Sequence, residues 1–343
     1  ESFAFTIYGA DENYNANTNV FGNGTASAAN AGADGSSAIT FDKIEYSLAD
    51  AGKTYYYVIK ETSDLTNTGL TNSGDLGAKV EITDNHDGTL STKVTYNNGQ
   101  VVTNTYAANG EVVLKATKTL TGRDWKDGES YAFVLQDAQG KAVNDADGNP
   151  IQATVSQNGE VTFPALKYTE ADIKTGTFNY VITETGNLAA NGLSKSNDIN
   201  VTVTVAVDGT DASKLNVTAS YDNNDTITNT YAATGSVTLE ATKKFAGAAY
   251  DWSGKEFEFV LSGNNTSESK KVTEAEPKAT FSAINYTLAD AGKTYTYTIS
   301  EANSGLAGVT ASDPLTVEVA VVDNGNGTLT ATPTYKNGSE ITN

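Results

Sequence analysis

The sequence predicts an all-β protein of tandem immunoglobulin-like β-sandwich modules arranged end to end. Short segments of alternating apolar and polar residues recur along the chain with turn residues between them, and no long segment has helical periodicity. The 343 residues include 18 Tyr, 11 Phe and 31 Gly but only 5 Pro. Aromatic residues favour pleated strands and glycines favour tight turns, so the composition agrees with the pattern. Many short strands with regular turn signals are typical of a sandwich.

Internal repeats predict three modules. One phrase occurs as FDKIEYSLADAGKTYYYVIKE at 41–61, FPALKYTEADIKTGTFNYVITE at 163–184 and FSAINYTLADAGKTYTYTISE at 281–301. Each copy is followed by a second phrase, which reads VVTNTY at 101–106, ITNTY at 227–231 and ITN at 341–343. The predicted modules are 1–106, which lacks its first strand, 107–231, which is complete, and 232–343, which is complete or nearly so. The links AANG and AATG are short, so we expect little independent movement between modules.

Smaller elements follow from turn chemistry. DNHDG at 84–88 and DNGNG at 323–327 have the residues of hairpin turns, and SLADAG at 47–52 is expected to form one short helical turn. The segments 10–38 and 262–278 differ in length and sequence between the copies, so we interpret them as variable loops.

Composition excludes several classes of function. The net charge of −20 argues against nucleic acid as a partner, since phosphate binding needs clustered Lys and Arg. No apolar run is long enough for membrane insertion. Cys is absent, which excludes disulfides and thiol nucleophiles. DNHDG at 84–88 and DADGN at 145–149 lack the spaced Glu of a calcium loop, so we expect plain turns, no metal and no cofactor.

Three kinds of polar residue fall on faces that are otherwise apolar. Because side chains alternate across a strand, Lys118 shares its face with Leu114, Ala116 and Leu120, while Lys115 points outward. The same alternation puts further residues among aromatic and aliphatic neighbours: Lys243; Glu61, Glu184 and Glu301; Asn104, Asn229 and Asn343. A Lys, a carboxyl and an Asn recur together in this way in the second and third modules.

Burying an ionised group alone is very costly, so these residues make sense if they meet. Burial raises the pKa of an acid and lowers that of an amine, which favours neutral Glu and neutral Lys. A neutral amine is a nucleophile, and a protonated carboxyl can polarise the Asn carboxamide. Attack would expel ammonia and leave a Lys–Asn amide, with proximity supplied by a dry core. Taken singly, such a Lys could also be an edge residue whose amine reaches solvent.

The phrases ATKTLTGRDWKDGESYAFVL at 116–135, ATKKFAG at 241–247 and TNTY at 103–106 and 228–231 resemble isopeptide-linker repeats. Such repeats occur in Gram-positive pilins and surface adhesins, akin to the B-type repeats of collagen adhesins. The resemblance implies bonds from Lys118 to Asn229 and from Lys243 to Asn343. Glu184 and Glu301 would be their catalytic carboxyls.

The same resemblance implies a structural stalk of a bacterial surface protein. The stalk would resist force and protease, be extracellular and anchored to the cell wall, and catalyse nothing beyond its own single-turnover cross-linking. Its partners would be neighbouring repeats of the same longer protein, with a host ligand at a distal tip.

The first module departs from the pattern. ESFAF at 1–5 aligns with ESYAF at 129–133, and Lys118 lies eleven residues before Glu129. The Lys-bearing strand is therefore expected before residue 1, which leaves Glu61 and Asn104 without their Lys and a sheet edge bare. We interpret the sequence as a window from a longer array. The alternative is that a neighbouring chain donates the strand.

Two other functions stay open at this point. The variable segments could form an adhesive module that binds a host protein or glycan, which an aromatic-lined pocket would favour. A hydrolase is the third option, but the single His, His86, lies inside the predicted turn DNHDG, and no Ser-His-Asp set can be built elsewhere.

Overall fold

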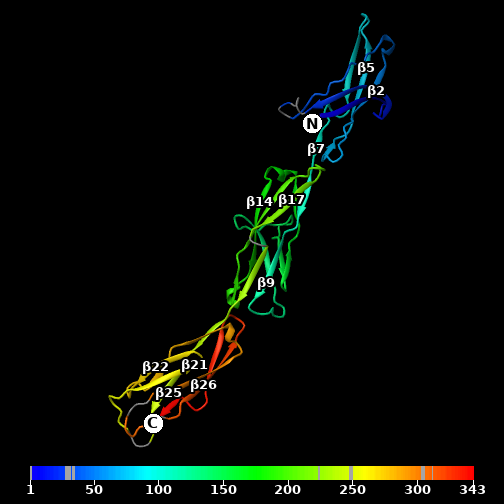
Figure 1. Cartoon of the computed structure of the whole chain (residues 1–343). Coiled ribbons are helices and arrows are strands. Elements are labelled where there is room, and N and C mark those ends of the chain that lie inside the picture. The colour runs from blue at the N-terminus through cyan, green and yellow to red at the C-terminus, as the bar shows by residue number, and fades with distance from the viewer. Residues whose placement is uncertain are drawn as a thin grey trace. The chain divides into compact units, whose positions relative to one another are not determined.

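The computed structural model describes residues 2–27, 32, 35–222, 225–246, 250–302, 306–310 and 312–343. These residues form strands joined by turns (Figure 1). Within them the helical elements are short 3₁₀ segments of three to five residues: η2 (Leu48–Asp50), η3 (Glu170–Lys174), η4 (Ala189–Asn191) and η5 (Leu288–Asp290). The described part of the chain holds no helix of the length and hydropathy that a membrane span requires. The predicted all-β class of tandem sandwich modules is confirmed.

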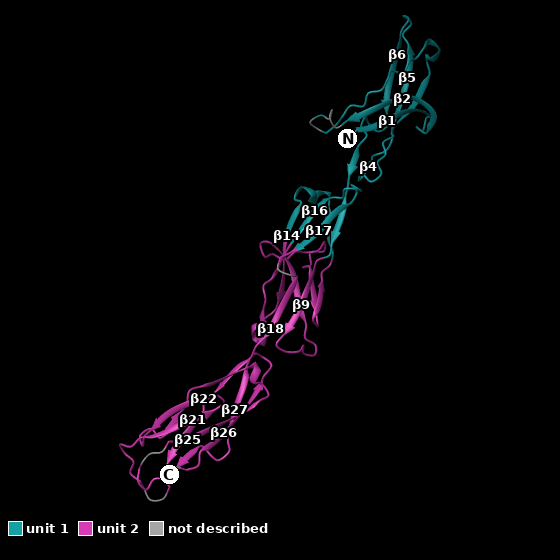
Figure 2. Cartoon of the chain, viewed as in Figure 1, with its two compact units in different colours: residues 1–113, 165–178, 202–220 teal, residues 114–164, 179–201, 221–343 magenta. Residues whose placement is uncertain are grey.

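The chain divides into two compact units, coloured separately in Figure 2. The first comprises Glu1–Val113, Ala165–Phe178 and Thr202–Ser220, and the second comprises Leu114–Pro164, Asn179–Val201 and Tyr221–Asn343. The division runs through the middle repeat. Each group of interacting side chains described below lies within one unit.

The first repeat has one large sheet and one small one. The large sheet has the order β2-β1-β3-β5-β6, and β4 pairs with β7. The strands are β1 (Ser2–Ala10), β2 (Ala16–Ser27), β3 (Thr54–Glu61), β4 (Leu70–Asn72), β5 (Leu76–Asp84), β6 (Leu90–Tyr96) and β7 (Asn104–Tyr106). Alternate residues of β1, β3 and β5 are apolar and buried, and they form one core cluster.

The second repeat has a five-stranded sheet of order β11-β10-β14-β16-β17 and a four-stranded sheet of order β12-β9-β18-β15, with β8 paired to β13. Its strands are β8 (Asn109–Val112), β9 (Lys115–Thr121), β10 (Tyr131–Asp137), β11 (Gln152–Val155), β12 (Gly159–Thr162), β13 (Leu166–Thr169), β14 (Thr177–Thr185), β15 (Leu193–Lys195), β16 (Ile199–Val207), β17 (Leu215–Tyr221) and β18 (Thr226–Tyr231).

The third repeat has the same plan. Its sheets have the orders β22-β21-β25-β26-β27 and β23-β20-β28, with β19 paired to β24. The strands are β19 (Thr234–Val237), β20 (Glu240–Lys244), β21 (Phe257–Gly263), β22 (Thr266–Val272), β23 (Lys278–Thr280), β24 (Ile284–Thr287), β25 (Thr294–Glu301), β26 (Leu315–Asp323), β27 (Leu329–Tyr335) and β28 (Glu340–Thr342).

In each of these two repeats, strand pairing places the strand that carries the Lys beside the last strand. β9 runs parallel to β18 with Lys118 opposite Ile227, and β20 runs parallel to β28 with Lys243 opposite Ile341. The two Lys residues therefore stand at one register position, although about one repeat length separates them in sequence.

Most of the predicted turns are present. The segment 84–88 joins β5 to β6, and 323–327 joins β26 to β27. The predicted helical turn in SLADAG is η2, where Asp50 accepts a hydrogen bond from the Ser47 amide. His86 has a positive φ of 60° in its turn and its side chain is 87% exposed.

The variable segments differ from the prediction. Segment 10–38 contains β2, which pairs with β1, and segment 262–278 contains β22, which pairs with β21. Each is an edge strand of the large sheet, so these segments are not loops throughout. Alternation is weak in both: ANTNVFGNGTAS and TSESKKV are largely polar and face solvent, which is why the sequence pattern missed them.

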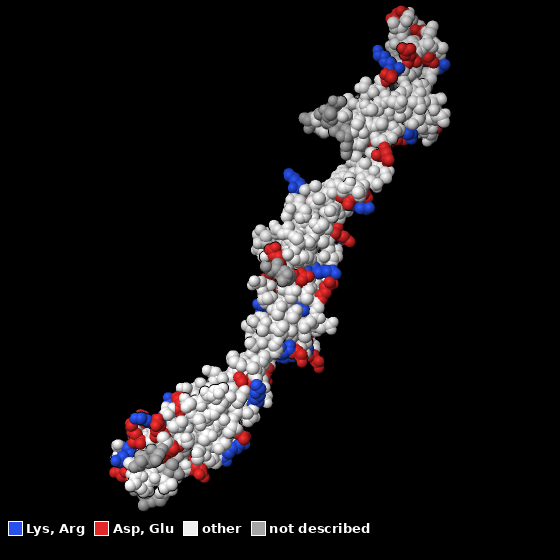
Figure 3. Space-filling model, in the orientation of Figure 1, with Lys and Arg blue, Asp and Glu red and all other residues white. Residues whose placement is uncertain are grey.

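Charged side chains are dispersed on the molecular surface. On the face shown in Figure 3, acidic and basic residues lie singly or in small groups of mixed sign. Several form exposed ion pairs across neighbouring strands, such as Lys115 with Glu160 and Lys336 with Glu318. Exposed pairs of this kind contribute little to stability.

Candidate functional site

In the second repeat, strand geometry directs three polar side chains into the space between the two sheets. Lys118 lies on β9 and Asn229 on β18 of the four-stranded sheet, while Glu184 lies on β14 of the five-stranded sheet. Glu184 stands opposite the fully buried Phe133 of β10. The side chains of Lys118 and Glu184 are both 0% exposed, and Asn229 is equally buried.

The carboxylate of Glu184 joins the other two side chains. Lys118 Nζ donates a hydrogen bond to Glu184 Oε2 at 2.7 Å, and Asn229 Nδ2 donates one to Glu184 Oε1 at 2.6 Å. The amine and the carboxamide are therefore held on the two oxygens of one carboxylate. Lys118, Glu184 and Asn229, expected from the sequence to meet, do come together.

The third repeat contains the same arrangement. Asn343 Nδ2 donates a hydrogen bond to Glu301 Oε1 at 2.7 Å. Lys243 Nζ lies 2.7 Å from Glu301 Oε2 as an ion pair, with angles outside hydrogen-bond geometry. Glu301 stands opposite Phe259 of β21, the position that Phe133 has for Glu184. The side chains of Lys243 and Glu301 are 0% and 1% exposed.

Burial lowers the pKa of Lys118 and of Lys243 below the ordinary value for lysine, although the neighbouring Glu opposes the shift in each case. Removal of water disfavours the charged amine more than the carboxylate favours it. Aromatic rings complete the surroundings: Lys118 Nζ lies 4.6 Å from the ring centre of Tyr131, and Lys243 Nζ lies 4.7 Å from those of Phe245 and Phe257. Both amines are thus shifted toward the nucleophilic, uncharged form.

The carboxamide oxygens of the two Asn residues lack hydrogen-bond partners among the described residues. Oδ1 of Asn229 and of Asn343 are buried and accept no hydrogen bond from the described residues. An unpaired buried polar atom is costly and rare in native structures, so two of them at equivalent positions indicate a functional constraint.

The first repeat holds part of this site. Glu61 stands opposite Phe5, the same register as the other two Glu residues. Asn104 Nδ2 donates to Glu61 Oε1 at 3.1 Å, and Asn72 Nδ2 donates to Glu61 Oε2 at 2.5 Å. Among the described residues no Lys forms an ion pair with Glu61, so Asn72 binds the oxygen that the Lys binds in the other repeats.

Sequence reasoning missed two sets of residues beside these sites. The first is Asn72, which lies opposite Asn104 in the three-residue strand β4, a strand too short for a sequence pattern to identify.

The second set is a network next to Lys118 in the second repeat. Arg123 lowers the pKa of Glu129 to about 2, and Glu129 accepts a hydrogen bond from Tyr131. Burial is the main cause that raises the pKa of Tyr131 to about 12. In the sequence, the Glu that begins both ESFAF and ESYAF was the signal that could have indicated this network.

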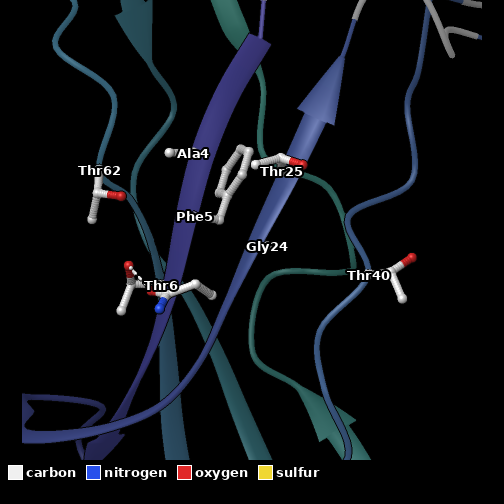
Figure 4. A pocket seen from close by; sticks show the side chains of 8 residues that line it. Ala4, Phe5, Thr6, Gly24, Thr25, Thr40 and Thr62 are labelled. Carbon is white, nitrogen blue, oxygen red and sulfur yellow. Dashed lines mark hydrogen bonds between the residues drawn. The ribbon is translucent and has the colours of Figure 1, made fainter.

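Three surface pockets formed by described residues have no Lys or Glu in their linings and so do not resemble these sites. Figure 4 shows one on the first repeat, of about 350 Å³, lined mainly by threonines and small residues: Ala4, Phe5, Thr6, Asn23, Gly24, Thr25, Thr40 and Thr62. A second pocket is lined in part by Tyr286, and a third is lined in part by Tyr46. None of these three pockets is lined by more than one aromatic ring. The described residues contain no cluster of three or more His, Asp and Glu that could hold a metal.

Fold and site together define a tandem β-sandwich protein in which a Lys and an Asn on neighbouring parallel strands share one buried carboxylate. The family model FctA, the Spy0128-like isopeptide-containing domain, matches residues 1–107, 114–232 and 239–343. The chain therefore belongs to this pilin-type family of isopeptide-containing domains, with three repeats.

Solved structures that the chain resembles include streptococcal and staphylococcal surface proteins. The major pilin protein T-13 of Streptococcus pyogenes is 16% identical, with a TM-score of 0.27 over 69% of this chain and 97% of the pilin. Two B repeat units of the collagen-binding protein of Staphylococcus aureus are also 16% identical, with a TM-score of 0.30 over 98% of this chain and 70% of that one. A search of curated proteins gave no match. The family assignment rests on the three repeat matches alone.

Proposed function

We propose that this chain is a stalk segment of a bacterial surface fibre whose second and third repeats are each closed by a Lys–Asn isopeptide bond. The single observation that supports this most strongly is the buried carboxylate that holds an amine and a carboxamide on its two oxygens, in the same way in two repeats. The bonds would join Lys118 to Asn229 and Lys243 to Asn343. The modules would be 1–106, 107–231 and 232–343.

The reaction needs no external reagent. A proton passes from the Lys118 ammonium to Glu184 across their 2.7 Å contact, which gives a neutral amine and a neutral acid. Nζ attacks Cγ of Asn229 while the carboxyl donates a hydrogen bond to the amide oxygen, once the amide has turned its unpaired oxygen toward the acid. Glu184 then passes its proton to Nδ2 and takes the second proton from Nζ, the Cγ–Nδ2 bond breaks, and the amide nitrogen leaves as ammonia. Each site reacts once, so the protein is not an enzyme with turnover.

The order of the strands determines how the proposed bond would carry tension through the repeat. The bond joins β9 and β18, which are adjacent, parallel and close to the two ends of the repeat in sequence. Tension entering along one strand passes directly to the other, and the intervening sheets bear none of it. Closing a loop of this length restricts the unfolded chain and contributes about 4–5 kcal/mol by the chain-entropy model used for disulfides. A chain without cysteine would gain covalent closure that reducing agents cannot break.

Location and partners follow from the same proposal. A force-bearing spacer belongs outside the cell, anchored at the wall, with neighbouring repeats of the same longer protein as its contacts. A host ligand would be bound at a distal tip rather than by these repeats.

Single-molecule stretching tests the proposal. When the chain is pulled from its two ends, the second and third repeats should give no unfolding extension, because the bond bypasses their folded loops. A Lys118→Ala variant should release the second repeat and add one extension step. Lys115→Ala is the matched control, since Lys115 lies on the same strand but faces solvent. Full extension of all repeats in the unaltered chain would contradict the proposal.

A further inference from the structure

The carboxylate of Glu129 is the centre of a polar network beside the second site. It accepts hydrogen bonds from both terminal nitrogens of Arg123, at 2.8 and 2.5 Å. The Lys126 amide donates to it at 2.9 Å and the Tyr131 hydroxyl at 2.6 Å. These bonds, led by those of Arg123, lower the pKa of Glu129 to about 2, so it is ionised at neutral pH. The reaction proposed above uses none of these groups.

The hydroxyl of Tyr131 is held so that its oxygen is a hydrogen-bond acceptor. A phenol has one hydrogen to donate, and Tyr131 donates it to Glu129. The lone pairs of the oxygen stay available to other donors, and the charge of Glu129 makes them more basic. The ring centre lies 4.6 Å from Lys118 Nζ, and hydrogen bonding by the Asn229 side chain opposes the rise in the pKa of Tyr131 that burial causes. Tyr131 therefore lies beside both residues that the proposed bond joins.

The third repeat has the ring without the network. Phe257 occupies the place of Tyr131, and its ring centre lies 4.7 Å from Lys243 Nζ. Lys255 occupies the place of Glu129, since each lies two residues before the ring and donates its amide to the carbonyl three residues earlier. Packing against the amine thus needs only an aromatic ring, and the hydroxyl with its carboxylate is an addition of the second repeat.

The two amines differ in alignment as well. Lys118 Nζ donates a hydrogen bond to Glu184 at 2.7 Å. Lys243 Nζ lies at the same distance from Glu301 but makes no hydrogen bond with the described residues. The amine is better aligned in the repeat that has the network.

We infer that Tyr131 is a further catalytic residue of the second site, an inference that rests on the proposed function. As Lys118 Nζ attacks Cγ of Asn229, positive charge develops first on Nζ and then on Nδ2 when Nδ2 is protonated. The Tyr131 oxygen accepts a hydrogen bond from the positively charged nitrogen and stabilises the transition state. Tyr131 neither gains nor loses a proton, so the bonds that form and break are those given above. Glu129 and Arg123 are positioning residues that hold the hydroxyl as an acceptor.

Tyr131→Phe removes the hydroxyl and keeps the ring, and Phe257 shows that this fold accommodates Phe at the position. The chain is made by cell-free translation, and aliquots are quenched in denaturing acid at a temperature low enough for the third repeat to link over many aliquots. Mass spectrometry then gives the fraction of linked peptide for each repeat.

The second repeat of the Tyr131→Phe chain should link about tenfold more slowly than that of the unaltered chain, the effect of one hydrogen bond to a charged group in the transition state. The third repeat should keep its rate. Tyr221→Phe is the matched control and should leave both rates unchanged, because the Tyr221 hydroxyl binds the Lys115 amide outside the site.

Glu129→Ala tests whether the network acts through Tyr131. It should slow the second repeat when Tyr131 is present, because the hydroxyl is then free to turn. In the Tyr131→Phe chain it should cause no further slowing, since the group that it holds is already absent. Further slowing there would show that Glu129 does not act through the hydroxyl and would contradict the positioning role.

The two repeats separate this inference from the proposed function. If both repeats of the Tyr131→Phe chain link at their unaltered rates, Tyr131 is not catalytic and the proposed function stands. If Tyr131→Phe slows both repeats equally, the effect lies in the folding of the chain, and the catalytic role is again wrong. If neither repeat of the unaltered chain links, the proposed function is wrong and this inference with it.

Discussion

At the scale of single residues, the buried Lys–Glu pairs are the feature that most needs explanation. Removing two charges from water costs several kcal/mol per ion, and their attraction only partly offsets this. A pair of apolar residues would stabilise the core at least as well, so stability alone does not account for Lys118 with Glu184 or Lys243 with Glu301. The proposed conversion of the amine to an amide would remove the charge from the interior permanently, which would account for the pairs.

The role of the Glu184 carboxyl in the proposed reaction can be tested without changing Lys118 or Asn229. In a Glu184→Gln chain we expect the second repeat to keep its ammonia while the third repeat loses it, because only the proton carrier of one site has been removed. Intact mass spectrometry reads the difference directly. Glu160→Gln is the matched control, since Glu160 is 56% exposed and bound to Lys115. Normal cross-linking of the second repeat in the Glu184→Gln chain would show that the carboxyl is not required.

The lowered pKa of Lys118 predicts a pH dependence in a chain that cannot react. With Asn229→Ala the amine stays free, and between its folded pKa and the unfolded value of about 10.4 the unfolded chain binds more protons. Stability should therefore rise with pH through this window and fall as pH drops through it.

Urea unfolding can isolate this effect in the second repeat. Trp125 contacts Tyr131 there, so its fluorescence in a Trp252→Phe background reports on that repeat. Adding Lys118→Met to this chain should abolish the part of the pH dependence that comes from the Lys118 amine. The free energy of unfolding should then rise less steeply with pH. Equal slopes with and without Lys118 would show that burial has not lowered its pKa.

At the scale of strands, the inward and outward faces could be predicted from alternation alone. Lys118 and Lys115 were separated correctly because a strand turns successive side chains to opposite faces. The partners across the sandwich could not be derived this way, since alternation gives a face but not a register. The resemblance to isopeptide-linker repeats supplied the pairing instead. β2, β22 and Asn72 were missed because polar edge strands and three-residue strands carry little periodic signal.

Close backbone contact limits what can change where the second and third repeats meet. Gly192 follows η4 with φ of 72°, and a Cβ there would lie 2.3 Å from Cα of Gly327. Tyr231, two residues after Asn229, donates a hydrogen bond to Asp323 in the same region. The strand that carries Asn229 thus leads directly into contacts with the following repeat.

Gly192→Ala should lower the thermal stability of the chain more than Gly148→Ala. Gly148 also has a positive φ, 85°, but no atom lies within 4 Å of its Cβ position. Both alanines bear the conformational cost of about 1–2 kcal/mol, so the difference between their melting temperatures isolates the steric clash. Equal melting temperatures would mean that Gly192 and Gly327 are not packed together in solution.

At the scale of the whole molecule, three repeats of one fold differ in the side chains that contact the buried Glu. The second and third each contain Lys, Glu and Asn in contact, and the first contains Glu and Asn with Asn72 in place of the Lys. The all-β class, the repeats and the residues of the site could be predicted from the sequence. The sheet orders could not, because strand order depends on long-range pairing that no local pattern encodes.

The intact mass of the purified chain, followed by peptide mapping, tests the central claim most directly. We expect a mass below that of the plain sequence by two ammonia units, one for each complete site. Peptides joining Lys118 to Asn229 and Lys243 to Asn343 should account for both, and Glu61 and Asn104 should appear in unlinked peptides. A mass equal to that of the plain sequence, with all four residues unlinked, would contradict the account.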